Sequence, residues 1–171
     1  MILEQENAED WWEVEALFDL CFAPGREALS SYRLREGVEP VARLCLVARD
    51  EGIVSGAIRA WPVRVSGHAV ALIGPVAVHP THQGEGLGGM MIREVVKRAS
   101  SIGWNRLMLV GDAPYYGRFG FRQLDGVEMP PPTNPARVLG IGDWTSVRGR
   151  VVRAAGASAP PTHQGARLSK P

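Results

Sequence analysis

Residues 74–89 read Gly74-Pro75-Val76-Ala77-Val78-His79-Pro80-Thr81-His82-Gln83-Gly84-Glu85-Gly86-Leu87-Gly88-Gly89. The apolar first part predicts a strand, the His-Pro pair that follows predicts a turn, and the glycines lead into a helix. Glycines let the backbone approach an anion closely, and a helix N-terminus adds free N–H groups and the positive end of the helix dipole. The segment therefore predicts a cradle that binds phosphate.

The elements around this segment predict one sheet. Three apolar segments joined by Asp50-Glu51-Gly52 and Ser66-Gly67-His68 predict an antiparallel meander. The helix after the glycines runs to about Ser101, and such a crossover implies parallel pairing of the strands on either side of it. The predicted strands are 2–4, 43–49, 54–65, 69–78, 106–110, 137–142 and 150–154, and the other predicted helices are one that Asn7 or Asp10 caps, 26–35 and 114–118.

The 171 residues suit one domain, expected at residues 1–154 and followed by a loose tail, 155–171, that is rich in Ala, Gly, Ser and Pro. A net charge of +1 gives no electrostatic reason to expect a nucleic acid or a membrane surface as a partner. Two cysteines are too few for a disulfide framework or a metal cluster. With no signal-like or membrane-spanning apolar run, we expect a cytoplasmic protein without a bound metal.

The glycines allow a dinucleotide-binding interpretation. Residues 84–89 match the pattern G-x-G-x-x-G, and Asp112 follows the next predicted strand, where a ribose-binding acid could lie. However, residues 79–83 separate the strand from the first glycine, whereas a dinucleotide loop begins almost at the strand end. The antiparallel meander also differs from repeated β-α-β units. An NAD-binding oxidoreductase is therefore the less favoured alternative.

A resemblance to a known family favours another interpretation. Residues 78–88 are similar to the acetyl-CoA pyrophosphate loop of the GNAT superfamily of N-acetyltransferases, and Gln83, Gly86 and Gly88 fill its pattern Q/R-x-x-G-x-G/A. Residues 109–121, with Tyr116 and a closing Gly120-Phe121, resemble a second block of the family, most closely in a bacterial group of predicted N-acetyltransferases. The resemblance covers residues 1–145. It implies an α/β (α+β) fold with a mixed, mostly antiparallel central sheet flanked by helices, in the order β-α-α-β-β-β-α-β-α-β-β.

The same resemblance implies an enzyme that transfers an acetyl group from acetyl-CoA to a primary amine in a ternary complex. Tyr116 is the expected general acid, because a phenol with a pKa of about 10 can protonate a departing thiolate whose thiol has a pKa of about 8.5. The backbone N–H of Val78 is expected to polarise the thioester carbonyl. The expected cofactor-binding residues are Val76, Ala77, Val78, Gln83, Gly84, Glu85, Gly86, Leu87, Gly88, Tyr115 and Phe119.

Several points stay open in the sequence. His79, Glu39 and Asp112 are candidates for the general base, and none is favoured. Leu109 stands where many family members carry an asparagine that helps to hold the pantetheine. The acceptor, a small molecule or a peptide, is expected to bind between residues 22–40 and 124–136. The resemblance also allows a homodimer, since members of the family often dimerise. A non-catalytic sensor that binds acyl-CoA on the same fold remains a further alternative.

Overall fold

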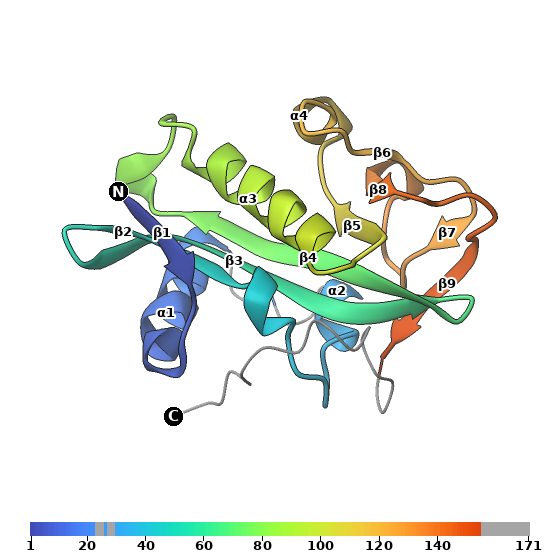
Figure 1. Cartoon of the computed structure of the whole chain (residues 1–171), viewed down its shortest axis with the longest axis horizontal. Coiled ribbons are helices and arrows are strands. Elements are labelled where there is room, and N and C mark those ends of the chain that lie inside the picture. The colour runs from blue at the N-terminus through green and yellow to red at the C-terminus, as the bar shows by residue number, and fades with distance from the viewer. Residues whose placement is uncertain (23–25, 27–29, 155–171) are drawn as a thin grey trace.

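The computed structural model describes residues 1–22, 26 and 30–154, and the tail predicted at 155–171 lies outside them. Figure 1 shows a long twisted sheet with helices on both sides. The helices are α1 (Trp11–Cys21), α2 (Ser30–Arg33), α3 (Leu87–Ser101) and α4 (Ala113–Gly117), with short 3-10 turns at Ala8–Asp10, Ala42–Leu44, Pro80–His82 and Pro135–Arg137. The strands are β1 (Ile2–Gln5), β2 (Leu46–Asp50), β3 (Ile53–Val65), β4 (His68–Val78), β5 (Arg106–Val110), β6 (Arg122–Gln123), β7 (Val127–Glu128), β8 (Val138–Gly142) and β9 (Gly149–Arg153).

The strand order confirms the predicted mixed, mostly antiparallel sheet. The described strands lie in the order β1-β2-β3-β4-β5-β8-β6, and β9 pairs with both β3 and β7. In the main sheet β4 and β5 are parallel, as the helical crossover between them predicted, and the other neighbours are antiparallel. This topology excludes the doubly wound sheet of a dinucleotide-binding fold, so the Rossmann interpretation of the glycines is wrong.

The two parallel strands separate soon after they meet. They pair only where Ala71 and Leu72 of β4 face Leu107 and Met108 of β5. Beyond this point β4 bulges, because three steps from Ile73 to Val76 correspond to only two steps on β3. A bulge redirects a strand and interrupts its pairing. The end of β4 therefore diverges from β5 and leaves a gap between them.

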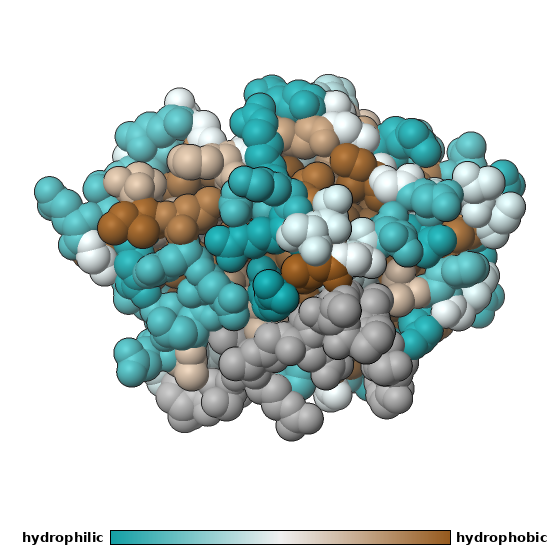
Figure 2. All heavy atoms as spheres, viewed as in Figure 1, coloured by the Kyte–Doolittle hydropathy of each residue, from teal (hydrophilic) through white to brown (hydrophobic). Residues whose placement is uncertain are grey.

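Alternating side chains of the sheet form cores on its two faces. On one face α3 contributes Met91, Ile92, Val95 and Ala99 to the first core, which includes Ile73 and Leu109. On the other face Val14, Leu17 and Phe18 of α1 pack on Ala57 and Ala77. Figure 1 shows α3 and α4 on one side of the sheet and α1 and α2 on the other. On the visible face, Figure 2 shows hydrophilic side chains around smaller apolar areas.

The element boundaries differ from the predictions mainly at turns. Residues 42–44 form a 3-10 turn, so the strand predicted from Arg43 begins only at Leu46. Asn7 caps the 3-10 turn at Ala8–Asp10. Asp10 makes no side-chain cap for α1, because its carboxylate accepts from the Asn7 N–H and pairs with Arg49. Among the described residues of the predicted helix 26–35, Ser30–Arg33 form an α-helix, which is α2. The short strands β6 and β7 were not predicted, because two residues are too few for a periodic pattern.

Candidate active site

The glycine segment forms a left-handed loop at the start of α3. Gly84 and Gly86 have φ values of +84° and +80°, and Gly86 caps the helix. Side chains with a Cβ are disfavoured in this region, so the glycines are needed for the loop shape. Gln83 closes the loop, because its Nε2 donates to the Val78 carbonyl at 3.3 Å. The Glu85 carboxylate lies 2.9 Å from the His82 ring, and the Leu87 side chain is buried. Both side chains are therefore engaged elsewhere, and these two residues contribute only their backbone groups to the loop.

A cavity of about 410 Å³ lies over this loop. Its other wall comes from the segment 115–119, and Tyr115 packs its ring edge-to-face on Phe119. Gly88 and Gly89 bring α3 close to these rings, since a Cβ on Gly89 would lie 3.0 Å from Phe119. Arg93 and Arg118 also line the cavity, and each stacks over one of the two rings. We call this space the cradle cavity; its glycine amides and two arginines suit a phosphate-bearing ligand.

A second cavity, of about 180 Å³, lies at the gap between β4 and β5, and we call it the gap cavity. The β4 bulge, Leu109 and Val110 of β5, and Tyr116 form one part of its wall. Side chains from α2 and the segments that flank it form the rest. Val76 lines the gap cavity, and Val78, two residues further along β4, lines the cradle cavity. The end of β4 thus connects the two sites.

Backbone groups on this part of β4 are directed into the gap. His79 N–H donates to the Ser55 carbonyl at 2.8 Å, and bonding to an antiparallel neighbour alternates along a strand. Ala77 therefore directs its groups toward β3, while Val76 and Val78 direct theirs toward the gap. Ala77 also packs its side chain in the α1 core, so we correct the expectation that it contacts a cofactor. Val76, and not Val78, lines the cavity wall that also holds Tyr116.

The two neighbouring tyrosines face different cavities. Tyr115 lines the cradle cavity, whereas Tyr116 lines the gap cavity and packs edge-to-face on Phe121. Gly111 makes room for Tyr116, because a Cβ at that position would overlap its ring. Burial raises the pKa of Tyr116 above its ordinary value of 10.0, and the nearby Tyr115 and Asp112 add to this effect. The phenol is therefore protonated at neutral pH, as a general acid must be.

The candidate bases are occupied elsewhere or lie outside the gap cavity. The His79 ring accepts from the Thr81 N–H at 3.2 Å and caps the short turn at Pro80–His82. The Asp112 carboxylate caps α4 by accepting from the Tyr115 N–H at 3.1 Å. Glu39 is exposed, and neither His79, Asp112 nor Glu39 lines the gap cavity. Leu109, at the position of the family asparagine, is buried in the α3 core and lines this cavity with an apolar surface.

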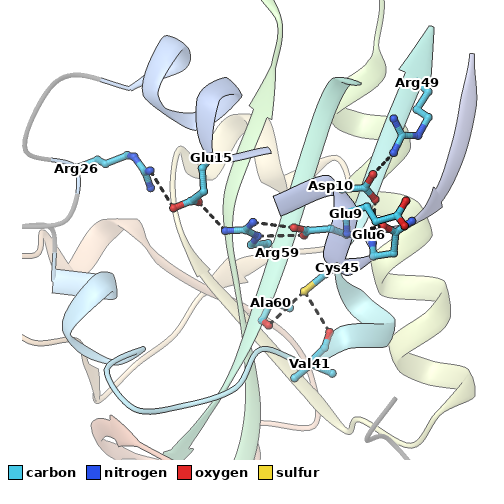
Figure 3. Close-up of polar contacts among 11 residues, drawn as sticks. Glu6, Glu9, Asp10, Glu15, Arg26, Val41, Cys45, Arg49, Arg59 and Ala60 are labelled. Atoms are coloured by element: carbon cyan, nitrogen blue, oxygen red, sulfur yellow. Dashed lines mark hydrogen bonds and ion pairs between the residues drawn. The ribbon is translucent and has the colours of Figure 1, made fainter. Parts of the chain in front are cut away.

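A chain of paired charges, which is buried at Glu6 and Arg59 and reaches the gap cavity at Arg26, was not predicted from the sequence. Figure 3 shows it running from Glu6 through Arg59 and Glu15 to Arg26. Arg59 binds Glu6 with two hydrogen bonds, of 2.7 and 3.0 Å, and Glu15 with one of 2.8 Å. Its Cζ also lies 4.5 Å from the centre of the Trp11 ring. Arg59 alternates with apolar residues in a strand, and that pattern alone does not distinguish a buried arginine from a solvated one.

The two segments predicted to form the acceptor cleft lie at or near the gap cavity. Phe22, Arg26, Ser31, Tyr32 and Arg35 line the gap cavity from the segment 22–40. The late loop approaches the same segment, because the Ser30 and Thr133 hydroxyls lie 2.8 Å apart. Individual residues of this wall were not predicted, since they come from a segment without a motif. Among the described residues, no helix is long and apolar enough to cross a membrane, and no group of His, Cys, Asp and Glu suits a metal ion.

Comparison with known proteins agrees with this geometry. The N-acetyltransferase YhbS of Escherichia coli K12 is 32% identical over 124 residues, which are 71% of this chain and 73% of that protein. The crystal structure of E. coli YhbS in complex with CoA has a TM-score of 0.76 at 26% identity and covers 93% of both chains. A GNAT family acetyltransferase from Brucella melitensis, solved with acetyl-CoA, has a TM-score of 0.68 at 28% identity and covers 92% of this chain and 97% of that one. The model of the acetyltransferase (GNAT) family matches residues 11–121, and the chain belongs to this family.

Proposed function

We propose that this protein is an N-acetyltransferase that moves the acetyl group of acetyl-CoA directly to a primary amine in a ternary complex. The observation that carries the proposal is the continuity of two different sites along the end of β4. A phosphate cradle lies at one end, and a small cavity with a buried tyrosine lies at the other. CoA in the YhbS complex and acetyl-CoA in the Brucella complex support the choice of cofactor.

The residues around the cradle fit the cofactor. The amides of residues 83–88 would hold the pyrophosphate at the start of α3, where the helix dipole also favours an anion. Arg93 and Arg118 would pair with the phosphates, and Tyr115 and Phe119 would cover the chain that joins them to the thiol. The outward backbone groups of Val76 and the N–H of Val78 would bond the pantetheine amides like an added strand, whereas the Val78 carbonyl already accepts from Gln83 and Cys21.

Acetyl-CoA supplies the thioester. A carbon–nitrogen bond forms to the acceptor amine, the carbon–sulfur bond breaks, the amine loses one proton and the thiolate gains one. The Val76 N–H, in place of the Val78 N–H expected from the sequence, would donate to the carbonyl oxygen as negative charge develops there, because Val76 shares the gap cavity with Tyr116. Tyr116 supplies the proton to the thiolate, and its raised pKa keeps that proton available at neutral pH. The acceptor must react as the neutral amine, because only an unprotonated nitrogen has the lone pair that forms the new bond.

One experiment separates this proposal from the alternatives. Acetyl-CoA at about 100 times its Kd should stabilise the folded protein by about 2.7 kcal/mol, and NAD should give no shift. Release of CoA is then followed on a panel of amines with the wild-type protein and Tyr116→Phe. Stabilisation with turnover supports the enzyme. Stabilisation without turnover on any amine favours the acyl-CoA sensor, and no stabilisation by acetyl-CoA refutes both.

A further inference from the structure

The gap cavity contains one cation that the rest of the described protein does not neutralise. Its lining includes two charged side chains, Arg26 and Arg35, and no Asp or Glu among the described residues. Arg26 is paired, because it lies 3.0 Å from Asp19 and 3.5 Å from Glu15 and donates to the Tyr32 hydroxyl at 2.7 Å. Arg35 forms no ion pair with any described residue.

Arg35 is held in place by aromatic rings. Its Cζ lies 3.7 Å from the centre of the Tyr32 ring and 5.2 Å from that of Trp61. Its Nε is buried and has no hydrogen-bond partner among the described residues. Stacking fixes a guanidinium without using its N–H donors. Burial lowers the pKa of Arg35 to about 10, so it still carries its charge at neutral pH. Tyr32 also hydrogen-bonds the guanidinium, but the buried Nε–H costs stability unless a ligand satisfies it.

We propose that Arg35 is a specificity-determining residue that binds an oxyanion of the acceptor, so that the substrate is a small amine that also carries a carboxylate or a phosphate. The inference rests on the proposed function, because the same cavity contains Tyr116. A planar guanidinium binds either group with two parallel hydrogen bonds. The cavity of about 180 Å³ suits a small molecule.

The positive charge of Arg35 also affects the binding of the reacting amine. An ordinary amine is a cation at neutral pH, and a cavity with an unneutralised Arg35 disfavours a second cation. An anionic group on the acceptor compensates this charge and anchors the molecule. The described lining of the gap cavity includes no carboxylate that could compensate the charge of Arg35 instead.

The test uses pairs of amines that differ by one anionic group. Phenylalanine is compared with phenylalaninamide for the carboxylate, and ethanolamine phosphate with ethanolamine for the phosphate. Wild-type kcat/KM should be about 10- to 100-fold higher for the anionic member of at least one pair, the size of a charge-assisted hydrogen bond. Arg35→Gln should remove that preference and leave the neutral member and the KM for acetyl-CoA unchanged, while Arg35→Lys should retain part of it. Arg33→Gln, at an exposed arginine two residues before Arg35, is the matched control.

A binding measurement complements turnover and needs no acetyl-CoA. N-acetylphenylalanine and its amide are titrated into the protein by NMR, with N-acetylethanolamine phosphate and N-acetylethanolamine as the second pair. Only an anionic member should bind, and Arg35→Gln should abolish its binding. Equal use and equal binding of both members, equal losses in Arg35→Gln, or no detectable binding of any probe would overturn the proposal. Absence of CoA release from every amine, with Arg35-dependent binding of an anionic probe, would instead contradict the proposed function alone.

Discussion

At the scale of single residues, Tyr116 is the side chain with the most closely specified chemistry. Tyr116→Phe keeps the ring that packs on Phe121 and removes only the proton donor. We expect kcat to fall by about 10²- to 10⁴-fold, the usual contribution of a general acid, with an unchanged KM for acetyl-CoA. Tyr115→Phe is the control, because Tyr115 lines the other cavity. An equal loss in both variants, measured by steady-state release of CoA, would contradict the assignment.

The pH dependence of the rate follows from the raised pKa of Tyr116. The protonated phenol is the active form, and it is lost only as the pH rises through its pKa, which lies above 10.0. The rate should therefore increase from about pH 6 as the acceptor amine loses its proton, and Tyr116 should cause no decline below about pH 10. A pH profile of kcat tests this expectation. A fall with an apparent pKa below about 10 that is absent from Tyr116→Phe would show that the phenol titrates too early.

Gly111 tests the position of the same ring. A methyl group there would overlap Tyr116, so Gly111→Ala should lower the free energy of unfolding by about 1–3 kcal/mol and reduce kcat as the ring moves. Gly117, in α4, is the matched control, because nothing lies within 4 Å of the position that a Cβ would take there. Gly117→Ala should be neutral or stabilise by up to about 1 kcal/mol. Urea unfolding of both variants measures the difference, and equal stabilities would refute the packing argument.

At the scale of elements, the left-handed turn before α3 combines backbone strain with function. Gly86→Ala places a side chain at a φ of +80°, which costs about 1–2 kcal/mol, and also crowds the phosphate site. Gly67 has a nearly identical φ of +79° in the distant β3–β4 turn. Both alanine variants should lose similar stability, and only Gly86→Ala should raise the KM for acetyl-CoA, by about tenfold or more. An unchanged KM in Gly86→Ala would remove this turn from the cofactor site.

The sequence predicted the elements that carry strong local patterns. The meander, the crossover helix and the glycine loop follow from alternation, helical spacing and turn residues, and the structure confirms them as elements. The gap between β4 and β5 could not be predicted from a local pattern, because the Gly74-Pro75 bulge has no pattern of its own. Arg35 and Tyr32 could not be assigned to the site, since long-range packing brings α2 to β4. The same holds for the pairing of Glu6 with Arg59, 53 positions apart.

At the scale of the whole molecule, the buried ion pair between Glu6 and Arg59 ties the start of the chain to the central strand β3. Arg59→Met would leave the Glu6 carboxylate buried without its cation, so the free energy of unfolding should fall by about 3–5 kcal/mol. Arg98→Met removes the partly exposed helical pair with Glu94 and should cost less than about 1 kcal/mol. Urea denaturation compares the two. A loss below about 1 kcal/mol in Arg59→Met would mean that the pair does not support the fold.

Amide hydrogen exchange in the presence and absence of acetyl-CoA tests the central claim, that one ligand spans both cavities along β4. We predict that exchange slows by about tenfold or more at Val76, at Val78 and across residues 83–88, while the β3–β4 turn at residues 66–68 is unaffected. Protection confined to residues 83–88 would show that the ligand stops at the cradle and does not enter the gap. Protection at neither segment would contradict the claim altogether.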